Sequence, residues 1–201
     1  MKDFKKIRLV LNSVLPAVIL YEWLNMFFFA NGNLLSSRGL QSLKYFTILS
    51  NLLEAFACLW WLFRKDEVLK FMASVAVMLT CIVVLVFLGP MFGYRAMFAG
   101  PNLWFHLLVP LTALAEVLFL VNRTYSKKEI FLASLTMAVY GIFYLGNILI
   151  NGIGQRHASN DWYGFLNWGY MAGALIFLFI VITNWITAFS LRLIRNRTTR
   201  S

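Results

Sequence analysis

The chain has 201 residues, of which 61% are hydrophobic and only 13% are charged, and its formal net charge is +10. A soluble domain usually carries about 25% charged residues because its core must be covered by a polar surface, so the composition excludes a soluble protein. The basic residues stand in small groups beside apolar segments, which is typical of membrane orientation signals and argues against a nucleic-acid-binding protein.

Six apolar segments are long enough to cross a bilayer, which takes about 20 predominantly apolar residues. In chain order we place them at 9–30, 43–63, 69–89, 102–121, 129–150 and 164–190. The first segment is longer than the apolar part of a signal peptide and lacks a small-residue cleavage site, so we interpret it as a retained span. Gly and Pro residues in 89–101 exclude a continuous helix between the third and fourth spans. The sequence therefore predicts an all-α protein, a single domain over 1–201 with six transmembrane helices.

The distribution of basic residues predicts the orientation of these spans. Fourteen of the 18 basic residues fall on the side of the two termini, and the other side holds only Arg38, Lys44, Arg95 and Arg156. By the positive-inside rule, both termini face the cytoplasm of a cell membrane. The two cysteines lie within apolar segments, which favours small buried hydrophobic residues over a disulfide or a metal site. The sequence indicates neither a metal nor a cofactor.

Polar side chains occur at a similar depth in five of the six spans, in the outer third of the bilayer if each residue rises 1.5 Å. They are Glu22, Asn25, Thr47, His106, Tyr144, Asn147 and Asn167. In the second span Ser50, Asn51 and Glu54 share a helix face with Thr47, because their spacing is i+3, i+4 and i+7. Each polar group could also serve only as hydrogen-bonding glue between helices, worth about 0.6–2 kcal/mol.

Two short motifs in these spans resemble a known family. Residues 44–53, KYFTILSNLL, are similar to the K-Y-[LF]-T-x-L motif of the androgen-induced and androgen-dependent TFPI-regulating membrane proteins and to the F-T-x-x-S-N form of their bacterial six-helix relatives. His106, with Pro110 four residues on and Glu116 ten residues on, resembles the histidine helix of that family. Residues 161–167 are a looser echo of its aromatic stretch. Leu103-Trp104-Phe105 stands where eukaryotic members often carry a second histidine and an asparagine.

The resemblance implies an intramembrane threonine hydrolase that cleaves lipid esters such as fatty acid esters of hydroxy fatty acids. Carried over by motif, the threonine is Thr47 and the histidine is His106. On this hypothesis Thr47 attacks the acyl carbonyl, His106 is the general base, and Ser50 or Asn51 orients the nucleophile or binds the oxyanion. The expected partners are membrane lipids and a lipid-ester or other small-molecule substrate.

Two other classes of function stay open at the sequence level. A transporter or a substrate-binding membrane subunit could use Glu22, Asn25, His106, Tyr144 and Asn167 as an outward-facing polar pocket, with Glu54 and Glu116 as a proton route. Alternatively, the polar residues only pack helices in a structural or regulatory membrane protein.

Overall fold

The computed structural model describes residues 2–30, 37–154 and 160–199, and within them the chain is built of helices. The long helices are α1 (Lys2–Phe29), α2 (Phe46–Arg64), α3 (Glu67–Val83), α8 (Lys127–Asn151) and α9 (Tyr170–Thr198). Shorter α-helices are α4 (Gly89–Phe92), α5 (Tyr94–Met97), α6 (Pro101–Leu103) and α7 (Val109–Ala115). The π-helical turns are η2 (Val84–Leu88), η3 (Trp104–Leu108) and η4 (Glu116–Leu120), and the 3₁₀ turns are η1 (Gly39–Lys44) and η5 (Phe165–Trp168).

Six helical segments in the described residues are long and apolar enough to cross a membrane, which confirms the predicted all-α six-span fold. They are Phe4–Phe29, Phe46–Arg64, Glu67–Phe92, Pro101–Leu120, Lys127–Asn151 and Tyr170–Thr198. The third is α3–η2–α4 in one line, and the fourth is α6–η3–α7–η4. The helix of the third span continues past Pro90, because Pro is tolerated in the first turn of α4, and it ends only at Gly93, whose φ is +88°.

The predicted start of the sixth span is wrong. Residues 164–169 form a 3₁₀ turn between Gly164 and Gly169, whose φ values of +69° and +90° a long helix does not accommodate. The helix begins at Tyr170 and continues to Thr198, beyond the predicted end at 190. Asn167 therefore lies before the span, on the exposed side of the turn, and not inside the membrane segment as predicted.

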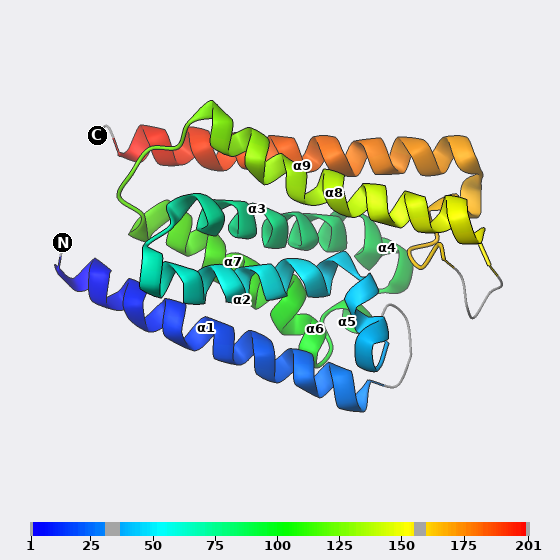
Figure 1. The fold of residues 1–201 in the computed structure, drawn as a ribbon, viewed down its shortest axis with the longest axis horizontal. Helices are drawn as coiled ribbons and strands as arrows, with labels where there is room; N and C mark the ends of the chain where they lie inside the picture. Colours follow the sequence, from blue (N-terminus) through cyan, green and yellow to red (C-terminus); the bar gives the residue numbers. More distant parts are fainter. Residues whose placement is uncertain (1, 31–36, 155–159, 200–201) are drawn as a thin grey trace.

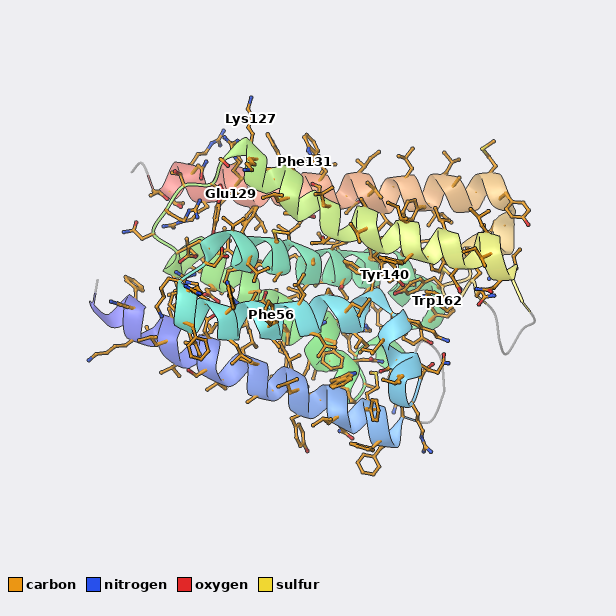
Figure 2. All side chains as sticks on the ribbon, viewed as in Figure 1. Phe56, Lys127, Glu129, Phe131, Tyr140 and Trp162 are labelled. Atoms are coloured by element: carbon orange, nitrogen blue, oxygen red, sulfur yellow. The ribbon has the colours of Figure 1, made fainter. Side chains whose placement is uncertain are left out.

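The third span is the centre of the bundle. α3 packs against α2, α7, α8 and α9, while α1 covers α2 on one side (Figure 1). The most apolar window of the third span is 61% buried, compared with 28% in the first and sixth spans. Both chain ends lie at the same end of the bundle, which we call the termini end (Figure 1). The outward faces carry large apolar side chains such as Phe131, 63% exposed, which points away from the bundle (Figure 2) and is suited to contact with lipid.

Local sequence explains the turns at the termini end. α2 closes at Lys65 in the left-handed conformation (φ +54°), and Asp66 caps α3 by accepting the backbone N–H groups of Val68 and Leu69. α8 begins with a capping box, in which Ser126 and Glu129 each bind the backbone N–H of the other. These caps satisfy helix ends that would otherwise carry unpaired donors.

Candidate functional site

Thr47 and His106 line the same small buried cavity, at the end of the bundle opposite the termini end. Its volume is about 10 Å³, close to the minimum that holds one water molecule. Its other polar lining residues are Tyr45, Asn102 and Tyr163, and its apolar walls are Met26, Ile48 and Leu88. Burial raises the pKa of the Tyr163 phenol, which lies in the connection outside the spans and stays a neutral hydrogen-bonding group. We call this space the Thr47–His106 cavity.

The ring of His106 is held in one tautomer. It lies on the π-helical turn η3, is 4% exposed, and its Nδ1 is 2.6 Å from the carbonyl oxygen of Met97. A carbonyl oxygen only accepts hydrogen bonds, so Nδ1 carries the hydrogen and Nε2 of the neutral ring is left as the acceptor. Pro110 lies in the first turn of α7, four residues after His106, and offers no N–H to the carbonyl of His106. The histidine is thus oriented by backbone and available as a base through Nε2.

Thr47 is fixed by its neighbours on α2. Its carbonyl oxygen accepts hydrogen bonds from Ser50 Oγ at 3.0 Å and from Asn51 Nδ2 at 2.8 Å. The same Asn51 nitrogen lies 3.2 Å from the carbonyl oxygen of Phe105, the residue before His106. Asn51 therefore ties the turn that carries Thr47 to the turn that carries His106. Its amide donors are taken up by these backbone carbonyls, which leaves Asn102 as the side-chain amide that lines the cavity.

A much larger cleft opens between α2 and α8, with α3 as its floor. Its volume is about 1570 Å³. Its part nearer the termini end is apolar, with Leu49, Leu53, Met72, Leu135 and Val139, whereas polar residues gather at the end away from the termini. Those polar lining residues are Ser37, Arg38, Gln41, Lys44, Asn147 and Asn160. We call this space the lateral cleft, and its lining changes from polar to apolar along its length.

Two cations and no carboxylate are found among the described residues that line the lateral cleft. Lys44 Nζ lies 5.3 Å from the ring centre of Tyr45 and 5.9 Å from that of Trp162, and no described carboxylate pairs with it. Burial lowers the pKa of Lys44, which lies in η1 outside the spans. The polar end of the cleft is thus a positively charged surface that is partly shielded from water.

A thin wall separates the lateral cleft from the region around Thr47. Phe46 and Tyr140 line both the cleft and a second, apolar cavity of about 40 Å³, which Thr47 also lines. The Tyr140 hydroxyl donates to the carbonyl oxygen of Lys44 at 2.7 Å and accepts from Trp162 Nε1 at 3.0 Å, and Figure 2 shows the two rings together. Thr47 is therefore one layer of side chains away from the cleft.

Asp161 organises the aromatic residues of this wall. Its Oδ1 accepts from the Tyr144 hydroxyl and from the backbone N–H of Phe165 at 3.0 Å, and its Oδ2 accepts from the backbone N–H of Leu166 at 2.8 Å. These bonds fix residues 161–166, so that Trp162 lines the cleft and Tyr163 lines the Thr47–His106 cavity.

The structure divides the predicted site residues among several places. Thr47 and His106 share the cavity, and Asn51 connects them. Ser50 bonds to Thr80 on α3, with 3.1 Å between the hydroxyl oxygens, and lines the lateral cleft. Tyr144 and Asn147 also line the cleft, and Asn147 Nδ2 donates to Asn160 at 3.1 Å.

Three predicted residues lie outside these spaces. Glu22 lines a separate shallow groove between α1 and Trp104. Asn25 is half-buried on α1 and lines neither the cavity nor the cleft. Asn167 is exposed on η5. Of the five residues expected in an outward-facing pocket, His106 thus lines the cavity and Tyr144 the cleft, whereas Glu22, Asn25 and Asn167 line neither. Arg156, counted for the orientation, falls outside the described residues.

A buried ion cluster near the termini end is not predicted by the sequence. It is made of Arg8, Glu54, Glu67, Lys70 and Glu116. Arg8 binds Glu67 through two bonds of 2.6 Å and Glu116 through one of 2.8 Å. Lys70 pairs with Glu54 and lies 3.1 Å from Glu116 Oε2. In the sequence Arg8 and Lys70 serve only as orientation signals. The one available signal is that Lys70 falls within the predicted span 69–89 and Arg8 directly precedes the span 9–30, while Glu54 and Glu116 fall within two further spans.

Comparisons with known proteins add no identification, because no family model, no curated protein and no solved structure matches the chain. The described residues also contain no group of three or more His, Cys, Asp or Glu side chains placed to hold a metal ion.

Proposed function

We propose that the protein is an intramembrane hydrolase of a lipid ester, with Thr47 as nucleophile and His106 as general base. The observation that carries the proposal is that these two residues, 59 positions apart and on different spans, line one buried cavity. The orientation of His106 by Met97 supports it, because a base must present its free nitrogen in a defined direction.

The reaction follows from these groups. The Thr47 oxygen forms a bond to the ester carbonyl carbon while its proton passes to His106 Nε2. The carbon–oxygen bond of the ester then breaks, and the proton moves from His106 to the leaving alcohol. Water then forms a bond to the acyl carbon while its proton passes to His106. The bond between that carbon and the Thr47 oxygen breaks, the acid leaves, and His106 returns the proton to Thr47. Asn102 is the amide donor available to the oxyanion in the cavity, whereas Asn51 positions the two reacting residues.

The lateral cleft supplies the route for a substrate that arrives from the bilayer. A cavity of about 10 Å³ does not accommodate an ester group, so a bound substrate must displace part of the wall formed by Phe46 and Tyr140. The apolar length of the cleft suits an acyl chain. The polar end holds the head of the molecule near Lys44.

We also propose that the protein resides in the cell membrane with both termini in the cytoplasm. The six spans and the shared position of the chain ends are consistent with this orientation, and the excess of basic residues on the side of the termini supports it. The Thr47–His106 cavity then lies in the outer half of the membrane.

A serine-type activity probe tests the hydrolase. Purified protein in lipid nanodiscs is treated with a fluorophosphonate probe, together with Thr47→Ala, His106→Ala and the control Thr183→Ala. Thr183, on α9, donates to the carbonyl oxygen of Phe179 in its own helix and lines neither the cavity nor the cleft. We expect labelling in the parent and in Thr183→Ala, and its loss in the other two variants. No labelling of a folded parent, or labelling that survives Thr47→Ala, would refute the hydrolase.

The charge of the lateral cleft favours a second candidate, the binding or transport of an anionic amphiphile without hydrolysis. Arg38 and Lys44 attract an anionic head, and the apolar part of the cleft accepts its chain. The test measures binding of a fluorescent fatty acid and of its uncharged amide to the parent, to Lys44→Gln and to the control Lys128→Gln at the termini end. The site is supported if the parent and Lys128→Gln bind the acid more tightly than the amide and Lys44→Gln does not. Equal binding of acid and amide would exclude it.

A further inference from the structure

The buried ion cluster holds more negative than positive charge. Its three carboxyl groups, Glu54, Glu67 and Glu116, face two cations, Arg8 and Lys70. Four of the five side chains are almost fully buried, with exposed fractions of 0% for Glu54, 1% for Glu116, 3% for Lys70 and 8% for Arg8, and Glu67 is 18% exposed. An uncompensated charge in such a place is strongly unfavourable, so the cluster needs one further positive charge or one bound proton.

The three carboxyl groups are not equally compensated. Glu67 receives two bonds from Arg8 and one of 2.9 Å from Trp61 Nε1. Glu116 accepts one hydrogen bond from Arg8 and one from Asn12, each 2.8 Å long, and its Oε2 also lies 3.1 Å from Lys70 Nζ.

Glu54 is the least compensated of the three. The one cation that pairs with it is Lys70, which it shares with Glu116. Its Oε1 also accepts a long hydrogen bond of 3.8 Å from Cys58 Sγ, and its Oε2 is buried with no hydrogen-bond partner. Oε2 of Glu116 has no hydrogen-bond partner either, but it lies 3.1 Å from Lys70 Nζ, and its Oε1 accepts from both Arg8 and Asn12.

We propose that the cluster is a binding site for a single exchangeable proton, held on Oε2 of Glu54. With that proton in place the cluster is neutral, because Glu67 and Glu116 balance Arg8 and Lys70. Oε1 of Glu54 still accepts from Lys70 as a carbonyl-like oxygen. An unpaired O–H group costs much less in an apolar interior than an unpaired charged oxygen, so the proton belongs on the unpartnered oxygen of the carboxyl group that has the fewest donors around it, which is Glu54.

The contacts also connect this proton to the surface. From Glu54 they pass through Lys70, Glu116 and Arg8 to Glu67, whose side chain is 18% exposed at the termini end. Chains of carboxyl groups move protons within membrane proteins, and Glu116 and Glu67 are the carboxyl groups of the cluster that lie between Glu54 and the surface. The Arg8 guanidinium keeps its proton and only holds these two carboxyl groups in place. Exchange with water therefore occurs at the termini end.

The other ionisable groups around the cluster do not replace the proton. Cys58 lies beside Lys70 on the α2 side, with 2.9 Å between Sγ and Nζ, and Tyr125 approaches from the connection before α8. Lys65 is exposed and lies over the ring of Trp61. Arg195, from α9, binds the carbonyl oxygen of Leu118 instead of a carboxylate of the cluster.

Matched glutamine variants of the full chain in lipid nanodiscs test the assignment. Glu54→Gln replaces one neutral group by another and should change the melting temperature by less than about 2 °C. Glu116→Gln removes a charge that two buried cations require and should lower it by roughly 6–20 °C. A Glu54→Gln variant that is destabilised as much as Glu116→Gln, or that does not fold, would overturn the proposal.

The dependence on pH and the infrared spectrum provide independent readouts. A folded state that holds one proton more than the unfolded chain loses stability as pH rises above about 5, so the parent should lose about 3–5 °C of melting temperature per pH unit relative to Glu54→Gln. The parent should also show the carbonyl stretch of a neutral carboxylic acid, and Glu54→Gln should lack it. Parallel pH curves, an unchanged band, or stabilisation of the parent by Na⁺ that Glu54→Gln abolishes would each contradict a bound proton.

Discussion

The carboxylate of Asp161 holds in place the aromatic residues that lie between the lateral cleft and the Thr47–His106 cavity. It uses both oxygens, because Oδ1 accepts from Tyr144 and the backbone N–H of Phe165 while Oδ2 accepts from the backbone N–H of Leu166. Asp161→Asn preserves the size of the side chain but turns one acceptor into a donor. In its better orientation the amide oxygen takes the place of Oδ1, and its NH₂ group then faces the N–H of Leu166.

At least one hydrogen bond to a charged group is therefore lost, which costs about 1.5–3 kcal/mol. In a chain of this length each kcal/mol lowers the melting temperature by about 2–4 °C, so we expect a decrease of roughly 3–12 °C. The loss should also loosen Trp162 and Tyr163, which line the cleft and the cavity.

Asp66→Asn provides a control with the same chemical change. Asp66 caps α3 with a single oxygen, Oδ1, which accepts from both Val68 and Leu69, so an asparagine keeps both bonds. Thermal unfolding in nanodiscs, followed by intrinsic tryptophan fluorescence, should show a change below about 2 °C for this variant. If Asp161→Asn melts within 2 °C of the parent, or if Asp66→Asn falls as far, the assigned role of Asp161 is wrong.

Three further predictions concern helix packing, the site and the cleft. Gly141→Ala should lower the free energy of unfolding by about 1–3 kcal/mol, because the new Cβ would lie 1.9 Å from the ring of Phe177. In the same melting assay Gly146→Ala should be neutral or slightly stabilising, because nothing lies within 4 Å of its new Cβ. Asn51→Leu removes two hydrogen bonds to backbone carbonyls, so it should lower the free energy of unfolding by about 1–3 kcal/mol and slow labelling by the probe. Unchanged labelling kinetics would count against the positioning role of Asn51. Burial lowers the pKa of Lys44, so its ammonium group loses its charge at a lower pH than that of an exposed lysine. As pH rises, fatty acid binding should therefore weaken earlier than it would with an exposed lysine. In a binding titration Lys44→Arg should still bind the fatty acid at high pH, because arginine stays charged.

The sequence alone determined the spans. The bilayer requires about 20 consecutive apolar residues for each crossing, and such a segment can be recognised in the sequence whatever the fold is. The six predicted segments each coincide with a helix, and the main error concerns 164–169, where two glycines in left-handed conformations form a turn before the helix. The depth of Thr47 and His106 was also readable, since rise per residue is constant along a helix.

Depth does not determine which way a helix face points, and only the tertiary structure decided that. Glu22 lies at the predicted depth of Thr47, yet it faces a groove on the other side of α1. Arg8 and Lys70 follow the rule that places basic residues at membrane interfaces, but both side chains are buried. Their burial became possible only because α2, α3 and η4 bring carboxylates from distant parts of the chain to within hydrogen-bonding distance of both cations. Charges that a sequence assigns to water can thus be neutralised inside a bundle by partners that no local pattern reveals.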